Sequence, residues 1–166
     1  MKRFPLQQLI QLREHRLEKA RQLVLQRQRE RQQCELACTR IEEEIAMLDA
    51  EKGEQRQRLL DPPPPGVDWS SVLAQREAHI ELLGLQAVAA RERLKQAQEK
   101  LREADNALRE AREAFFRAKA RQDALEKRKA VWRSEMLAQE LRLEEAANAD
   151  LLTVRPLTAG DNGGGP

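Results

Sequence analysis

The sequence predicts an all-α protein: a long two-helix antiparallel coiled-coil hairpin with a protruding C-terminal helix and a disordered tail. Charged residues make up 35% of the chain and aromatic residues 3%, a composition typical of long helices rather than of a globular core. A run of four prolines interrupts the chain at residues 62–65. Apolar residues recur every seven positions on both sides of that run, which is the period of a left-handed coiled coil.

The first helix is expected over about residues 6–60, with Pro5 fitting its first turn. We assign heptad position a to Ile10 and position d to Leu6, and repeat both every seven residues. Eleven of the sixteen resulting positions are apolar. The apolar core of this helix is expected to contain Ile10, Leu17, Val24, Ile41, Ile45 and Leu48.

A Pro-rich turn is expected at residues 61–67, because consecutive prolines remove backbone donors and clash with a continuing helix. Asp68, followed by Ser70 and Ser71, supplies candidate N-caps for the next helix.

The second helix is expected over about residues 68–150, and eighteen of its twenty-two a and d positions are apolar. Alanine occupies every d position from Ala90 to Ala118, which favours a larger side chain opposite each one. Residues 1–150 should therefore form a single coiled-coil hairpin, and residues 151–166 a flexible tail. The core of the second helix is expected to contain Leu94, Leu101, Leu108 and Phe115.

The register of the hairpin has two candidates. Placing Leu59 opposite Trp69 pairs residues whose numbers sum to 128, so that Leu17 meets Ala111. A slip of one heptad instead places Leu17 opposite Ala118. In the first register the second helix has no partner within the chain after roughly Gln122, an overhang of about 40 Å.

The overhang carries apolar residues that a solvated single helix does not need, which is typical of a binding site. These residues include Leu125, Trp132, Met136 and Leu137. We therefore expect a partner protein to surround this part of the chain.

No catalytic or metal-binding pattern is present in the sequence. Cys34 and Cys38 are interpreted as small core residues, because no second Cys or His pair accompanies them and His15 and His79 lie far apart. The sequence has no Gly-rich phosphate loop and no Ser, His and Asp set. It predicts a protein that is not an enzyme and needs no cofactor.

The charge is concentrated near the N-terminus. The formal net charge of the chain is +2, but residues 1–31 contain nine basic and three acidic side chains. Without interleaved aromatic residues, this stretch favours a solvated helix face or an acidic protein surface over nucleic acid. No apolar segment approaches the roughly 20 residues of a membrane span, so we expect a cytoplasmic protein without direct membrane insertion.

The opening MKRFPLQQLIQLRE at residues 1–14, followed by a helix rich in Gln, Arg and Ala, resembles the start of the FliJ-like and YscO-like coiled-coil proteins of type III secretion. The resemblance implies a central stalk similar to the γ subunit of rotary ATPases, with both chain ends inserted in the hexameric secretion ATPase. It also implies a link to the export gate protein, binding of export chaperones, and a location at the periphery of the inner-membrane secretion apparatus.

The residues expected to contact the ATPase ring come from both chain ends. The matched opening implies the first group, and the apolar overhang indicates the second. An alternative is a generic helical scaffold or export-chaperone escort protein that binds partners, or a second copy of itself, through the overhang. The two groups are Arg3, Phe4, Leu6, Leu9 and Arg13, and Trp132, Arg133, Met136 and Leu137.

Overall fold

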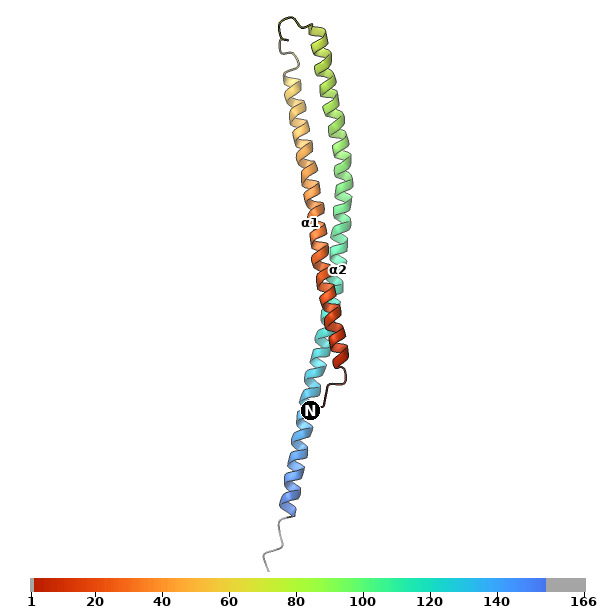
Figure 1. Ribbon diagram of the computed structural model, residues 1–166, viewed down its shortest axis with the longest axis vertical. Helices are drawn as coiled ribbons and strands as arrows, with labels where there is room; N and C mark the ends of the chain where they lie inside the picture. Colours follow the sequence, from red (N-terminus) through yellow and green to blue (C-terminus); the bar gives the residue numbers. More distant parts are fainter. Residues whose placement is uncertain (1, 155–166) are drawn as a thin grey trace, which may run out of the picture. The chain divides into compact units, whose positions relative to one another are not determined.

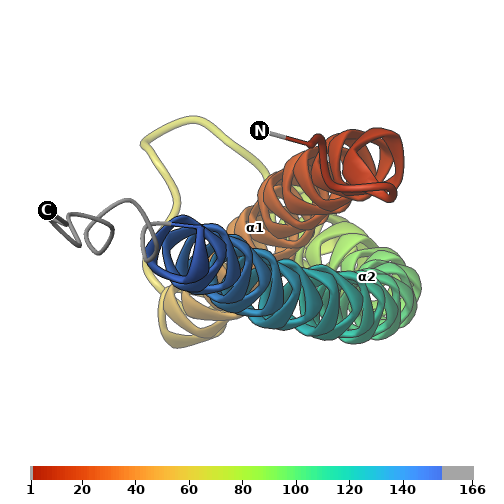
Figure 2. The same cartoon turned by 90° about the horizontal axis from the view of Figure 1, so that it is seen from below.

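The computed structural model describes residues 2–154, which form two long helices, α1 (Gln7–Gln57) and α2 (Trp69–Thr153). The two helices pack antiparallel, which confirms the all-α fold with two antiparallel helices (Figures 1 and 2). Residues 151–153, expected in the tail, continue α2, because the next helix-breaking residue in the sequence is Pro156. Residues 155–166 of the expected tail lie outside the described residues.

The chain divides into two compact units. The terminal unit contains residues 1–18 and 116–166, and the turn unit contains Lys19–Phe115. Each unit holds one stretch of α1 and one stretch of α2.

In the turn unit, Arg76 closes the end of α1. Its Nη1 donates to the backbone oxygens of Arg58, Leu59 and Asp61 at 3.2, 3.0 and 2.7 Å. Its guanidinium also lies 5.8 Å from the centre of the Trp69 ring. These three residues follow the last residue of α1, and the Arg58 oxygen also accepts a hydrogen bond from the Asp61 N–H at 3.1 Å. Arg76 therefore fastens the segment between α1 and the prolines to α2.

Asp68 caps the start of α2, as its sequence position predicted. Its carboxylate accepts hydrogen bonds from the hydroxyl of Ser70 at 2.9 Å and from that of Ser71 at 3.5 Å. The Ser70 hydroxyl, followed by the backbone N–H groups of Ser70 and Ser71, lowers the pKa of the Asp68 carboxyl. The charged form of Asp68 is therefore the form that fits this helix end.

The register in which paired residue numbers sum to 128 is wrong, and the structure has the register slipped by one heptad. In the turn unit, the Leu59 carbonyl faces Arg76 rather than Trp69. In the terminal unit, Ile10 shares a core with Leu125. Both pairs of numbers sum to 135. The difference arises because α1 ends at Gln57, which leaves a longer connection than the one assumed around Leu59.

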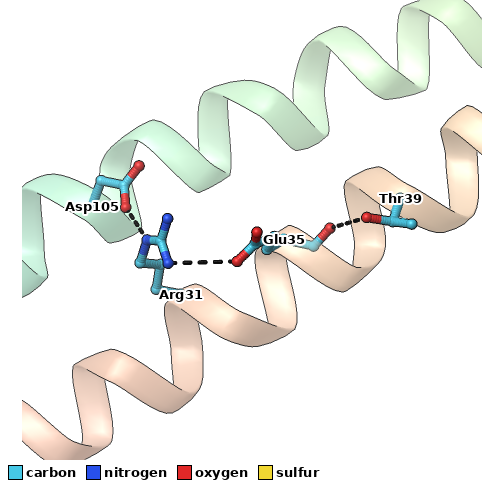
Figure 3. Close-up of polar contacts among 4 residues, drawn as sticks. All are labelled: Arg31, Glu35, Thr39 and Asp105. Atoms are coloured by element: carbon cyan, nitrogen blue, oxygen red, sulfur yellow. Dashed lines mark hydrogen bonds and ion pairs between the residues drawn. The ribbon is translucent and has the colours of Figure 1, made fainter.

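Ion pairs across the turn unit agree with this register. Arg31 binds Asp105 of α2 and also lies 3.4 Å from Glu35 of its own helix (Figure 3). Arg93 also pairs with Glu44 at 2.7 Å, and Arg91 with Asp49 at 2.9 Å, across the two helices.

The predicted heptad positions lie along the interface between the two helices. Of the ten expected core residues, Ile10 and Leu108 are buried, and the other eight are partly buried. Several alanines at or beside the repeat are also buried, so the helices approach closely there. The buried alanines are Ala87, Ala90 and Ala111.

Candidate partner-binding site

A small hydrophobic core holds the chain's first residues against α2 in the terminal unit. Phe4, Ile10 and Leu125 are buried together, with Leu9 and Trp132 packed against them. The rings of Phe4 and Trp132 are tilted by 60°, with centroids 5.4 Å apart, a favourable aromatic arrangement. Phe4 lies before the start of α1, and its backbone oxygen accepts a hydrogen bond from the Gln7 N–H at 3.1 Å.

A polar layer follows this core. Arg13 Nη1 donates to the backbone oxygen of Arg121 at 2.9 Å. Gln122 is buried, and its Nε2 donates to Glu126 at 3.1 Å. The Gln122 Oε1 atom has no hydrogen-bond partner among the residues described. Polar groups at core positions cost stability but restrict the alignments that two helices can adopt.

The terminal unit contains a groove of about 730 Å³, which we call the terminal groove. Trp132, Met136 and Leu137 provide apolar surface within it. Four cationic side chains and one carboxylate lie among these apolar residues. The remaining lining residues are Lys2, Arg3, Phe4, Gln7, Gln11, Lys129, Arg133 and Glu140.

A second hollow of about 660 Å³ shares Phe4 and Trp132 with the terminal groove. Leu6 and Val131 line it together with Lys127, Arg128 and Glu135. Both hollows therefore combine apolar surface with an excess of positive charge. Such a surface complements a protein segment that carries apolar and acidic side chains.

The nine residues expected to bind a partner all belong to the terminal unit. Six of them line the terminal groove and Leu6 lines the second hollow. Leu9 packs on the core, and Arg13 binds a backbone oxygen. The six in the groove are Arg3, Phe4, Trp132, Arg133, Met136 and Leu137.

Sequence reasoning missed three charged residues of the groove: Lys2, Lys129 and Glu140. Lys129 precedes Arg133 by four residues and therefore shares its helix face. That spacing is the signal that could have identified Lys129 from the sequence.

The first a and d residues of the expected overhang of α2 are buried. Leu125 was assigned to the overhang, but it is only 5% exposed, because the slipped register pairs it with Ile10. Gln122, the expected start of the overhang, is also buried. Beyond Glu140 every residue to Val154 is exposed. The large apolar residues of that segment are Leu141, Leu143, Leu151, Leu152 and Val154.

The two cysteines lie in the turn unit at neighbouring core positions. Cys34 is partly buried and Cys38 is buried. Burial, followed by the charge of Glu42, raises the pKa of the Cys38 thiol. Among the described residues there is no group of three or more His, Cys, Asp or Glu that could hold a metal ion.

Neither helix, within the residues that the structure describes, has the length and apolar character needed to cross a membrane.

Comparison with known proteins gives one family and one solved structure. The family model for YscO-like proteins matches residues 1–153. The structure of CT670 from Chlamydia trachomatis, a proposed YscO homologue, superposes with a TM-score of 0.76 at 19% identity. The alignment covers 93% of this chain and 94% of CT670. A search of the curated proteins gives no match.

Proposed function

Because the chain belongs to the YscO-like family of type III secretion components, we propose that it is the non-enzymatic central stalk of a secretion ATPase complex. Members of the family are generally non-catalytic. In this proposal the terminal unit inserts in the hexameric ATPase, and the turn unit links the ATPase to the export gate protein.

The terminal groove is the observation that carries this proposal. It combines residues from the segment before α1 and from the start of α1 with residues from α2. Together these residues form one surface of apolar and cationic side chains. A segment of the ATPase with acidic and apolar side chains would complement this surface. Arg3 and Arg133 would meet the acidic groups, and Met136 and Leu137 the apolar ones.

The last part of α2 supports the same proposal. Leu141 and Leu143 are 53% and 70% exposed, although apolar side chains of this size are normally covered. We propose that this segment is the protruding C-terminal helix and that the inner wall of the ATPase ring covers it.

The test uses the cognate secretion ATPase, with binding and ATP hydrolysis as the two measurements. A chain that ends at Glu140 keeps the Ile10 and Leu125 core but loses the exposed apolar segment. We expect it to bind about tenfold more weakly and to stimulate hydrolysis less. A chain that ends at Thr153 is the matched control and should behave like the full chain, since the family match also ends there.

Charge reversal tests the groove separately. Arg3→Glu combined with Arg133→Glu should weaken ATPase binding, whereas Met47→Glu should not, because Met47 is 73% exposed in the turn unit. Full binding and stimulation by both the Glu140-terminated chain and the Arg3 and Arg133 double variant would contradict the proposed site.

An export-chaperone escort is the second candidate function, favoured by the same exposed leucines after Glu140. The stalk function and the chaperone-escort function predict different losses of binding for the chain that ends at Glu140. If the chain that ends at Glu140 keeps ATPase binding but no longer binds export chaperones, this segment serves the chaperones instead of the ring.

A further inference from the structure

A separate groove of about 470 Å³, which we call the turn groove, lies between α1 and α2 in the turn unit. Its apolar lining includes Leu85 and Val88, which are 63% and 61% exposed. Residues 82–90 of α2 contain no charged side chain, although a helix of a two-helix hairpin needs only one apolar stripe. This part of α2 therefore has more apolar surface than α1 covers. The other apolar lining residues are Leu59, Ile80 and Gly84.

The rim of the turn groove carries opposite charges on its two sides. Lys52 and Arg56 come from α1, and Glu77 and Glu81 come from α2. None of the four forms an ion pair with another residue of the described chain. The two signs balance, so the groove as a whole favours neither a purely acidic nor a purely basic partner.

Gly84 lets a rim side chain lie across the apolar surface. A Cβ atom placed on Gly84 would stand 3.2 Å from Lys52 Nζ, so the end of the lysine side chain occupies the space beside the glycine. The Lys52 ammonium thus lies next to the apolar lining, where an acidic group of a docked partner can reach it.

We propose that the turn groove is the contact surface for a second copy of this chain, related to the first by a two-fold axis parallel to the helices. Such an axis places α1 of one copy over α2 of the other. Lys52 and Arg56 of each copy then face Glu77 and Glu81 of its partner, and the Leu85 and Val88 side chains of both copies pack together between them. The contact is isologous, because each copy uses the same patch.

Charge complementarity distinguishes a second copy from other occupants. A partner with a single sign of charge would satisfy one side of the rim and oppose the other. The patch itself has the required arrangement, with cations on one side and carboxylates on the other. This inference does not depend on the proposed stalk function.

Charge-swap variants provide the sharpest test. Lys52→Glu with Arg56→Glu makes the whole rim acidic, and Glu77→Lys with Glu81→Lys makes it basic. Each double variant alone should associate about tenfold more weakly than the unmodified chain in sedimentation equilibrium. An equimolar mixture of the two should form a mixed dimer, because all four rim contacts are then between opposite charges. Helix content by circular dichroism confirms that each variant is folded.

Apolar substitutions locate the contact on α2. Val88→Glu should abolish the dimer, whereas Leu82→Glu should not, since Leu82 is 50% exposed but does not line the groove. Loss of the dimer in Leu137→Glu, with no effect of Val88→Glu, would move the contact to the terminal unit and overturn the proposal. An unmodified chain that remains monomeric up to about 1 mM would also overturn it.

Discussion

Arg76 occupies a d position, where the heptad pattern calls for an apolar residue, and its guanidinium binds three backbone oxygens at the end of α1. Arg31 occupies an a position and binds Asp105. Each of these two arginines departs from the heptad pattern and binds polar groups in the other half of the hairpin. The sequence shows that they are exceptions, but it does not reveal which partner each one has.

Phe4 illustrates a residue whose environment could not be predicted from periodicity. It precedes α1 and was assigned to the partner surface, yet it is buried against Trp132 and Ile10. A residue outside a helix has no heptad position, so its burial depends on how the chain folds back onto α2.

Ile10 should be the most sensitive residue of the terminal unit, because it is 1% exposed and packs with Phe4 and Leu125. We expect Ile10→Ala to lower the free energy of unfolding by about 2–5 kcal/mol through lost burial and the cavity left behind. Urea unfolding followed by circular dichroism measures this change. Leu12→Ala is the matched control, since Leu12 is 44% exposed; an equal effect of both variants would contradict the assigned core.

The helices as elements were largely predictable, whereas their alignment was not. Heptad periodicity gives the contact face of each helix, and fifteen of the sixteen a and d positions of the first helix are buried or partly buried. The alanine repeat on α2 largely fits both registers, because a slip of seven residues places Val24 and Leu17 opposite another alanine and moves only Ile10, from Ala118 to Leu125. The deciding contacts involve Arg76, Phe4 and Leu125, which lie outside that repeat.

Crosslinking distinguishes the two registers. In a chain whose native cysteines are replaced by Cys34→Ser and Cys38→Ala, Leu17→Cys with Ala118→Cys should form a disulfide under mild oxidation, since these residues face each other in the structure's register. The pair Leu17→Cys with Ala111→Cys is the control. Gel mobility with and without reductant detects the disulfide. Faster disulfide formation in the control pair would instead support the register in which paired residue numbers sum to 128.

The N-terminal cap of α2 makes stability depend on pH. The folded-state pKa of the Asp68 carboxyl is below its ordinary value of 3.8. The charged carboxylate therefore stabilises the folded chain fully above that pH, and this stabilisation is lost as the pH falls through the folded-state pKa. Asp68→Ala should lower the melting temperature by roughly 2–4 °C at neutral pH.

The difference in melting temperature between the unmodified chain and Asp68→Ala should narrow as the pH falls below 3.8. Asp68→Asn is the control, because an asparagine caps a helix without titrating in this range. A difference between the unmodified chain and Asp68→Ala that stays constant down to acidic pH would show that the carboxylate charge does not act here.

At the scale of the whole molecule, the family match and the α2 helix both end at residue 153. The sequence-based resemblance rested on the first fourteen residues together with the expected two-helix architecture, and the family match covers residues 1–153. The terminal groove could be only half predicted. Its α2 residues follow from periodicity, but the positions of Lys2 and Arg3 depend on the fold of the segment before α1.

The alanine repeat also determines where the alignment of the two helices is specified. An interface that repeats every seven residues packs almost equally well after one helix shifts by seven residues. The repeat alone therefore does not select one register. The register is selected by two contacts outside the repeat. One is the contact of Phe4 with Trp132 in the terminal unit, and the other is the set of hydrogen bonds from Arg76 to the segment after α1 in the turn unit. Substitutions along the repeat should therefore change how tightly the helices hold, whereas substitutions at these two contacts should change which residues meet.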